Sequence, residues 1–558
     1  MPLLNEHIFW SYRLAKFEVA SERRGVGRLA FAKFEENLGQ RLLELDHSFQ
    51  DAPSLFKDID PGAVWVRPKS VEHKHPGLDD GSSFVSVPEQ AHDHHIQEIS
   101  VRVLLEPTPE FAVAEVIWLR WFGPVLETVL SPGCLGNRLD LHGSPPTVPA
   151  GGRRVFRYWA PAYRRFKSKA IDAAKWCLRK GNRRCILATL DLTTFYDNID
   201  PSFLLRDDFV LSVAESAAKA DRAFDETAYR EATAGLLTAY ATYRKKVAQI
   251  VGVKRDRGIP IGSLCSRMIA NLTLARLDHA AKAVQGVRYY ARYVDDILIV
   301  FRPEEESFES AKEVIAKFLP IDEAESTDKR LVADAAALGV PGTSLVVQTK
   351  KLRVFDLRGE QGLEYLATVE AEMQRVSSER RRFLDPWGAE LDQMVMASPN
   401  TEPIRALREA DALSLRRLAV GTISDKVATA AAMLDRESAA KFSQQFLGKA
   451  ARLATDWSRW VDLIDVSLRV LGSALASGDA ETANEVIKAL TARSASLADG
   501  VAPSFKVLWG EDELKEARAR RKLREWIEEQ LVEVVAGATP FKRSIGNECR
   551  SDARRSAA

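Results

Sequence analysis

Two stretches decide the fold: CILATLDLTTFYDNID at residues 185–200 and VRYYARYVDDILIVF at residues 287–301. The first begins with a short apolar run rich in branched side chains, which predicts a β-strand. The second predicts two strands joined by a short turn within YVDD. This arrangement places Asp191 at the end of a strand and Asp295 and Asp296 at the tip of a hairpin. We therefore expect the three carboxylates to meet at one edge of a sheet.

Adjacent carboxylates at a hairpin tip repel each other and add nothing to a sheet, so this pair indicates a bound cation. Magnesium prefers hard oxygen ligands and often takes one or two protein carboxylates together with substrate phosphates. Two such ions stabilise the attacking and leaving oxygens of an in-line displacement. Asp191 would supply the other side of a two-metal site for phosphoryl transfer. The alternative is an ordinary hairpin turn that contains two acids.

A third segment, GIPIGSLCSRMIANLTL from Gly258, predicts a turn that leads into a long helix. Gly258, Pro260 and Gly262 form a turn that would let the backbone approach a ligand closely. The helix begins near Ser263, and we expect its N-terminal amides to be free to face a phosphate or a template.

The remaining pattern is α+β. We expect helices over 110–129 with a break at Gly123-Pro124, over 162–180, over 201–251 and over 304–318, and a strand-like segment over 344–355. Residues up to about 100 contain Pro-, Gly- and Ser-rich stretches that are typical of loops between short elements. From about residue 370 the sequence is almost wholly helical in pattern. These shifts divide the chain into regions 1–105, 106–370 and 371–558.

Composition is that of a globular protein: 558 residues, 46% hydrophobic and 28% charged. No run is apolar and long enough to span a membrane, and no signal peptide is recognisable. Five scattered cysteines without a CxxC pair fit a reducing cytoplasm. Net charge is only +1, yet residues 151–184 hold twelve Lys or Arg and one acid, Asp172. Such an excess is typical of a phosphate-binding surface, and a solvated basic face is the alternative.

The three motifs in this order resemble the palm of reverse transcriptases: Asp191 with Phe195-Tyr196, GIPIGS with Ala270-Asn271, and YVDD. FYDNID, GIPIGS and the helical C-terminal region resemble more narrowly the abortive-infection and other defence-associated (unknown-group) reverse transcriptases of bacteria. The resemblance covers roughly residues 100–370. It implies right-hand polymerase fingers and palm over 106–370, with an N-terminal extension and part of the fingers before them. The α-helical, helix-pair-repeat-like region 371–558 would replace the thumb and would bind nucleic acid or form oligomers.

The resemblance also implies roles for individual residues. Asp191, Asp295 and Asp296 match the catalytic, metal-binding aspartates, and Leu192 belongs to the same metal site. Tyr196 matches an aromatic gate that would clash with a ribose 2′-hydroxyl and so favours deoxynucleotides; a core aromatic is the alternative. The full nucleotide-binding set that the resemblance implies is Tyr196, Phe195, Gly262, Ile261, Arg157, Arg164, Arg165, Lys167 and Lys350. Lys169 lies in the same basic segment.

The function implied is an RNA-directed DNA polymerase (a nucleotidyltransferase) that adds dNTPs with two Mg²⁺ ions, or with Mn²⁺, in cytoplasmic antiphage defence. It would copy an RNA template or a dedicated non-coding RNA, or would make untemplated DNA primed on a tyrosine. Expected partners are dNTPs, RNA, the DNA product and either further copies of the chain or a neighbouring defence protein, with no membrane. Ile261 stands where many reverse transcriptases have a glutamine, which puts ordinary templated fidelity in question. The alternatives are an RNA-dependent RNA polymerase, against which Tyr196 argues, and a catalytically silent RNA-binding scaffold.

Overall fold

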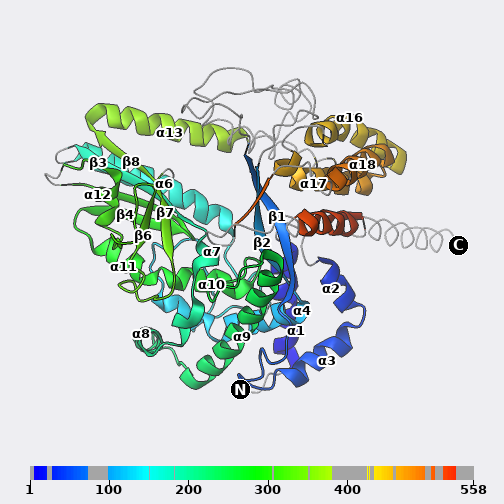
Figure 1. Cartoon of the computed structure of the whole chain (residues 1–558), viewed down its shortest axis with the longest axis horizontal. Helices are drawn as coiled ribbons and strands as arrows, with labels where there is room; N and C mark the ends of the chain where they lie inside the picture. The colour runs from blue at the N-terminus through cyan, green and yellow to red at the C-terminus, as the bar shows by residue number, and fades with distance from the viewer. Residues whose placement is uncertain are drawn as a thin grey trace.

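The computed structural model (Figure 1) describes residues 5–21, 28–72, 98–149, 151–180, 183–303, 307–349, 352–379, 424, 427, 433–455, 460–496, 504–508 and 520–535. Within these ranges the architecture is α+β, as the sequence predicted. Two β-sheets form its framework, which we call the central sheet and the hairpin sheet.

The central sheet has six strands in the order β4-β5-β3-β7-β6, with β8 also paired to β3. Its strands are β3 (Arg184–Thr193), β4 (Val287–Tyr293), β5 (Asp296–Phe301), β6 (Arg330–Ala333), β7 (Leu345–Gln348) and β8 (Arg353–Arg358). One edge of β3 pairs antiparallel with β5, and the other edge pairs first with β8 and then with β7. The predicted strand at 185–192 and the hairpin at 287–301 are confirmed, and the strand-like segment at 344–355 contains β7 and the start of β8.

Both faces of β3 are covered, because its side chains alternate between two cores. Ile186, Ala188 and Leu190 belong to the main hydrophobic core. Cys185, on the opposite face of the strand, belongs to a second cluster formed mainly with α6 (Trp159–Arg179). A strand held on both faces has a strongly specified register, which fixes the position of the acid at its end.

Helices surround the central sheet (Figure 1). They are α4 (Pro109–Trp121), α5 (Gly123–Leu126), α7 (Phe195–Asn198), α8 (Asp207–Lys219), α9 (Glu226–Val251), α10 (Leu264–Thr273), α11 (Ala275–Ala283), α12 (Ala311–Ala316) and α13 (Gly359–Glu379). The predicted break at Gly123-Pro124 is confirmed, since it separates α4 from α5. Helix α12 is shorter than the predicted helix over 304–318.

The hairpin sheet consists of the long antiparallel strands β1 (Gly62–Glu72) and β2 (Glu98–Pro107), with β9 (Ser504–Leu508) added parallel to β2. Figure 1 shows β1 and β2 (blue) between the central sheet and the C-terminal helices α16 (Arg436–Thr455), α17 (Trp460–Ser477) and α18 (Ala480–Ser496). Helix α17 packs on β1, where Arg67 Nη2 donates to Asp465 Oδ1 at 2.6 Å.

The structure corrects two expectations. The first of the stretches expected to be loops, residues 51–70, is a loop only in part, because residues 62–70 belong to β1; the helices α1 (Asn5–Ser21), α2 (Arg28–Glu35) and α3 (Leu38–Ser48) precede it, and the second stretch, 75–84, lies outside the described residues. The prolines misled the interpretation, because Pro68 lies at a β-bulge, where a ladder tolerates proline. The C-terminal region is not wholly helical, since β9 joins the hairpin sheet. Among the described residues, no helix is both long and apolar enough to cross a membrane.

Candidate active site

The three predicted aspartates lie together at one end of the central sheet. Asp191 of β3 is the direct antiparallel partner of Asp296 of β5. Asp296 also pairs with Tyr293 of β4, so only Val294 and Asp295 form the turn between the two strands. The amide of Leu192 donates to the carbonyl oxygen of Asp295 at 3.4 Å, which links the end of β3 to the turn. The hairpin geometry therefore brings the two sequence motifs into contact.

The electrostatics of this cluster favour a cation. Burial, and after it the nearby charges of Asp191 and Asp296, raise the pKa of Asp295 to about 6. Carboxylates that raise one another's pKa are stabilised when a divalent ion neutralises them. Among the described residues, no group of three or more His, Cys, Asp or Glu side chains is arranged to hold a metal ion by itself. The donor set suits an ion such as Mg²⁺, which completes its shell with substrate phosphates and water.

A buried polar network holds the YVDD turn. Arg292 and Asp278 of α11 form an ion pair with both side chains fully buried, and Arg292 Nε donates to Asp278 Oδ1 at 2.7 Å. The Tyr290 hydroxyl donates to the same oxygen at 2.7 Å. Arg292 Nη1 donates to Asn271 Oδ1 at 2.9 Å and to the Val294 carbonyl at 3.2 Å. The guanidinium therefore ties the turn directly to helices α10 and α11.

The GNRL segment, to which the sequence assigned no role, packs against this turn. A Cβ on Gly136 would lie 2.9 Å from the amide nitrogen of Val294, so only glycine allows this approach. Asn271 Nδ2 donates to the Gly136 carbonyl at 2.8 Å and to the Asn137 carbonyl at 3.2 Å. Arg138 in turn donates to buried Glu127 at 2.6 Å. The network thus extends from the turn into the loop that precedes α6.

Backbone strain marks both sides of the aspartate cluster. Val294 has a φ of 61°, and Thr194, three residues after Asp191, has a φ of 47°. A β-branched residue in the left-handed region is an outlier with an energetic cost. Such residues persist where the surroundings over-determine them, and Gly136 and the Arg292 network do so for Val294.

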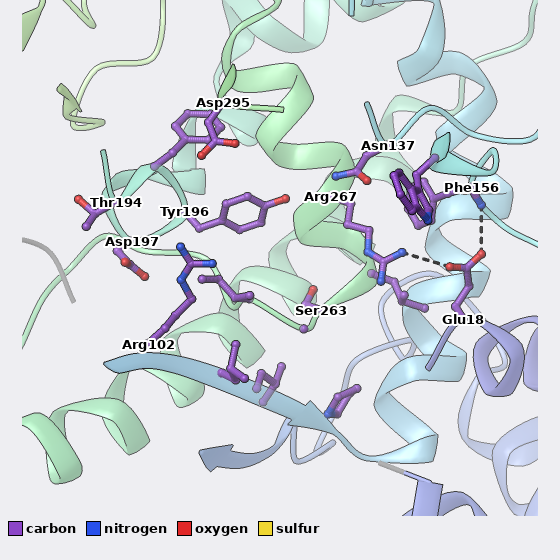
Figure 2. A pocket seen from close by; sticks show the side chains of 18 of the residues that line it. Glu18, Arg102, Asn137, Phe156, Thr194, Tyr196, Asp197, Ser263, Arg267 and Asp295 are labelled. Carbon is purple, nitrogen blue, oxygen red and sulfur yellow. Dashed lines mark hydrogen bonds and ion pairs between the residues drawn. The ribbon is translucent and has the colours of Figure 1, made fainter. Parts of the chain in front are cut away.

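A cavity of about 650 Å³ opens beside the aspartates (Figure 2). Asp191, Leu192 and Asp295 line one side of it. In Figure 2 the ring of Tyr196 lies between Asp295 and Arg102. Phe195 also lines the cavity, but its ring is buried in the main core and meets Tyr196 edge-on, with ring centroids 6.1 Å apart. Of these two rings, Tyr196 is therefore the one that faces the cavity, and Phe195 supports it.

The GIPIGS turn contributes to the cavity, but not through free helix amides. Glu115 of α4 is fully buried and accepts from the amides of Leu264 at 3.1 Å and Cys265 at 3.0 Å. The Ser263 hydroxyl also donates to Glu115 and accepts from the Ser266 amide at 3.2 Å. Burial raises the pKa of Glu115 to about 7 against these hydrogen bonds. The expectation that the N-terminus of α10 is free to bind a phosphate is therefore wrong.

Ile261 and Gly262 line the cavity, as expected of nucleotide-binding residues. Gly262 has a φ of +115°, and a Cβ there would lie 2.1 Å from the Leu105 carbonyl of β2. The Leu105 amide donates to the Ile261 carbonyl at 2.7 Å. The close approach that Gly262 allows is thus to the protein's own hairpin sheet and not to a ligand. The GIPIGS turn therefore contacts strand β2 directly.

The predicted basic residues separate into two groups. Arg157 lines the cavity, whereas Arg164, Arg165 and Lys167 are exposed on α6 and do not line it. Lys350 lies outside the described residues.

Sequence reasoning missed several residues that do line the cavity: Lys69 of β1, Arg102 of β2, Arg154, Arg267 of α10, Asn137 and Glu18 of α1. Burial raises the pKa of Asp197, also in the cavity wall, to about 7, and the charges of Arg102 and Lys69 oppose that shift. The Arg102 charge also acts on Asp295. Arg102 is therefore the cation from β2 that faces the aspartate cluster, and no local motif could have identified it.

The far wall of the cavity comes from the N-terminal helix. Figure 2 shows Glu18 bonded both to Arg267 and to the backbone of Phe156. Glu18 Oε2 accepts from Arg267 Nη1 at 3.1 Å, and its Oε1 accepts from the amides of Val155 at 2.9 Å and Phe156 at 3.3 Å. The Arg267 guanidinium also lies 5.2 Å from the centroid of the Phe156 ring. Helix α1 is thus part of the site.

Residues 148–321 match the family model of the reverse transcriptases (RNA-dependent DNA polymerases). The matched span contains β3 with Asp191, the GIPIGS turn, the β4–β5 hairpin and the whole of α6. No curated protein matches the chain. The family match supports a nucleotide polymerase of the reverse-transcriptase type, a class that binds nucleic acid and dNTPs and generally uses divalent metal ions.

Proposed function

We propose that this protein is an RNA-directed DNA polymerase that adds dNTPs by two-metal phosphoryl transfer in the cavity beside Asp191. The observation that carries the proposal is the register of Asp191 against Asp296, with Asp295 in the turn between β4 and β5. These acids line or border a cavity that also contains Tyr196 and several cations. The match of residues 148–321 to reverse transcriptases supports the same reaction class.

The carboxylates of Asp191, Asp295 and Asp296, with the backbone of Leu192, would hold two Mg²⁺ ions, and Mn²⁺ suits the same ligands. When bound, such ions neutralise the phosphates and activate the attacking 3′-oxygen. The residues of this chain supply positioning around that centre. The Arg292 network fixes the turn, and the paired strands fix Asp191 against Asp296.

The rest of the cavity would orient the incoming nucleotide. Arg102 and Lys69, on the hairpin sheet, and Arg157 would bind the triphosphate, because they bring positive charge to the wall of the cavity. The Tyr196 ring would stand against the 2′-position of the sugar and exclude a ribonucleotide. Ile261 and Gly262 would form the floor under the nucleotide.

The biological setting rests on the resemblance to defence-associated reverse transcriptases. We propose that the enzyme acts in bacterial antiphage defence and copies an RNA, or else makes untemplated DNA from a tyrosine primer. Region 106–370 would be fingers and palm, and 371–558 would replace the thumb. The C-terminal helices would bind nucleic acid or join further copies of the chain or a neighbouring defence protein.

The test is incorporation of each labelled dNTP or NTP by the purified full chain with Mg²⁺, with and without its co-purified RNA. Asp295→Ala and Asp296→Ala are the controls, and products are treated with protease and with RNase. Deoxynucleotide incorporation that disappears in both variants is the expected result. Incorporation of NTPs alone would indicate an RNA polymerase, and no incorporation by folded protein that still binds RNA would leave a scaffold.

A further inference from the structure

Helix α1 reaches the cavity through two consecutive residues, Phe17 and Glu18. Glu18 is buried, with 3% of its surface exposed, and lines the cavity. The guanidinium of Arg154, another lining residue, lies over the Phe17 ring with its Cζ 4.9 Å from the ring centroid. Both α1 residues lie outside the span 148–321 that matches the reverse transcriptases. What α1 contributes to the cavity is therefore not part of the matched family region.

The Glu18 carboxylate joins the backbone that precedes α6 to the guanidinium of Arg267. Its Oε1 accepts from the amides of Val155 at 2.9 Å and Phe156 at 3.3 Å. Its Oε2 accepts from Arg267 Nη1 at 3.1 Å (Figure 2). A buried carboxylate needs such donors, because each bond to water that it gives up costs free energy unless it is replaced. Removing the carboxylate would therefore release the guanidinium from the backbone that now holds it.

The backbone segment that Glu18 binds is also held on its other edge. The Val155 carbonyl accepts from the Asp140 amide at 2.8 Å, and the Arg157 amide donates to the Arg138 carbonyl at 2.8 Å. Hydrogen bonds on both edges fix the position of this segment. Glu18 therefore ties Arg267 to a part of the backbone that has supports other than α1.

Arg267 carries this fixed position into the cavity. It lies on α10 and lines the cavity, and its side chain is 17% exposed. In Figure 2 it is seen between Glu18 and Tyr196. A guanidinium carries several donors, so the bond to Glu18 does not exhaust its capacity to bind a ligand.

The ligand that fits this place is a single nucleotide. A cavity of about 650 Å³ has the size of a site for one small ligand. Asp191 and Asp295 line the same cavity as Arg267. An anion that meets the guanidinium there is thus expected to be a phosphate group of the nucleotide that the aspartates and their metal ions would act on.

We infer that Glu18 is a positioning residue of the nucleotide site, which holds the Arg267 guanidinium where it binds a phosphate group of the incoming nucleotide. A planar guanidinium binds phosphate through paired hydrogen bonds, so its orientation decides the strength of the contact. An arginine that is already oriented also loses less side-chain freedom when the ligand binds. This inference rests on the proposed function only in taking the ligand to be a dNTP.

The test is the dissociation constant of a dNTP analogue with a non-hydrolysable α,β-imido bond, titrated into the full chain with Mg²⁺ in a calorimeter. Glu18→Gln should raise this constant about tenfold, because the glutamine amide turns an N–H group toward a donor that the carboxylate now accepts from. Glu44→Gln on α3 is the matched control, because Glu44 accepts from Arg41 at 3.2 Å, is exposed and does not line the cavity. It should change the constant by less than about twofold.

Arg267 supplies two further variants. Arg267→Lys keeps the charge but loses the fork that can bond Glu18 and a phosphate together, so it should weaken nucleotide binding about as much as Glu18→Gln. In an Arg267→Met chain, Glu18→Gln should add less than about twofold, because the contact through which it acts is already lost. If circular dichroism shows that Glu18→Gln does not fold, Arg267→Lys decides the question alone.

An unchanged dissociation constant in folded Glu18→Gln or Arg267→Lys would overturn the inference and leave Glu18 a residue of the fold. Equal losses in Glu18→Gln and Glu44→Gln, or an undiminished effect of Glu18→Gln in the Arg267→Met chain, would do the same. Glu18-dependent binding of the analogue without any dNTP incorporation would contradict the proposed polymerase and leave the nucleotide site standing. Incorporation with a KM for dNTP that is unchanged in Glu18→Gln would contradict the positioning role and leave the polymerase standing.

Discussion

The YVDD turn and the β1–β2 hairpin face one cavity but are held by different parts of the chain. The turn is fixed by Arg292, Asp278 and Asn271, within about two dozen residues of it, and also by Gly136 and strand β3 from earlier in the chain. The hairpin is held from the C-terminal region, through the pairing of β9 with β2 and the bond from Arg67 to Asp465, 398 residues apart. The aspartate side of the cavity, where we propose the metal ions bind, is therefore built within residues 136–301, whereas the β1–β2 hairpin on the other side is also held by the C-terminal region.

The largest expected effect is on the metal side. Asp191→Asn removes a charged metal ligand and should lower dNTP incorporation about 10⁴-fold, since metal ions contribute several kcal/mol to such reactions. The assay is single-turnover incorporation of a labelled dNTP at saturating Mg²⁺. Asp207→Asn is the control, because the Asp207 side chain is 97% exposed on α8. A residual rate within tenfold of the native rate would remove Asp191 from the metal site.

The Arg292 network should control the stability of the same side. Arg292→Met leaves Asp278 buried without its partner and should lower the free energy of unfolding by about 3–5 kcal/mol. Urea denaturation in EDTA measures this change in the free energy of unfolding. Adding Asp278→Leu to Arg292→Met should recover part of the loss, because it removes the unpaired charge. A loss below about 1 kcal/mol in the single variant, the range of an exposed pair, would contradict a structural role for the ion pair.

On the hairpin side, Arg102→Ala should raise the KM for dNTP about 10- to 100-fold, as expected for the loss of a charge-assisted hydrogen bond. Mg²⁺ affinity and the fold should change little. Steady-state kinetics at several Mg²⁺ concentrations separate the KM for dNTP from the affinity for Mg²⁺. Arg288→Ala on β4, whose guanidinium stacks on Trp176, is the matched control. An unchanged KM would mean that the triphosphate lies elsewhere.

The dependence on the C-terminal region is tested by Asp465→Ala. Loss of the bond to Arg67 should shift the hairpin and raise the KM for dNTP about 3- to 10-fold, in the range of couplings carried through packed elements. Metal binding in the absence of nucleotide should stay as in the native chain. If metal binding weakens while the KM for dNTP is unchanged, the C-terminal region supports the aspartate cluster and not the β1–β2 hairpin.

The last effect is on the pH dependence of stability. The pKa of Asp295 is about 6 in the fold, above its ordinary value of 3.8. The folded state therefore binds more protons than the unfolded state between these values, and stability falls as pH rises through that window. Asp295→Asn should stabilise the metal-free protein by about 1–2 kcal/mol at pH 8, after allowance for solvent screening. The gain should vanish near pH 3.5, and thermal unfolding in EDTA at both values measures it.

The aspartate cluster on one side of the cavity could be predicted from the sequence, but most residues of the other side could not. Asp191, Asp295 and Asp296 stand in short segments whose strand pattern and acid content are both local. Arg102 and Glu18 reach the cavity only because β2 and α1 pack against elements distant in the chain. Their surroundings in the sequence carry no chemical signature.

The GIPIGS turn shows a further limit of sequence reasoning. Its glycines were correctly interpreted as permitting a close approach, but the approach is to Leu105 of β2. Its helix looked like a phosphate site until Glu115, from a helix 148 residues earlier, proved to cap it. Because this capping residue is so distant in the chain, no residue near the GIPIGS motif indicates that the helix N-terminus is capped.

The most direct test of the central claim is to count bound metal ions. Mn²⁺ replaces Mg²⁺, and the loss of the free Mn²⁺ signal in electron paramagnetic resonance is followed with a non-reactive dNTP analogue present. The account predicts two ions per chain for the native protein and for Asp207→Asn, and a loss of both tight sites in Asp191→Asn with Asp295→Asn. Unchanged Mn²⁺ binding in the double variant would contradict the assignment of the aspartates to the metal site.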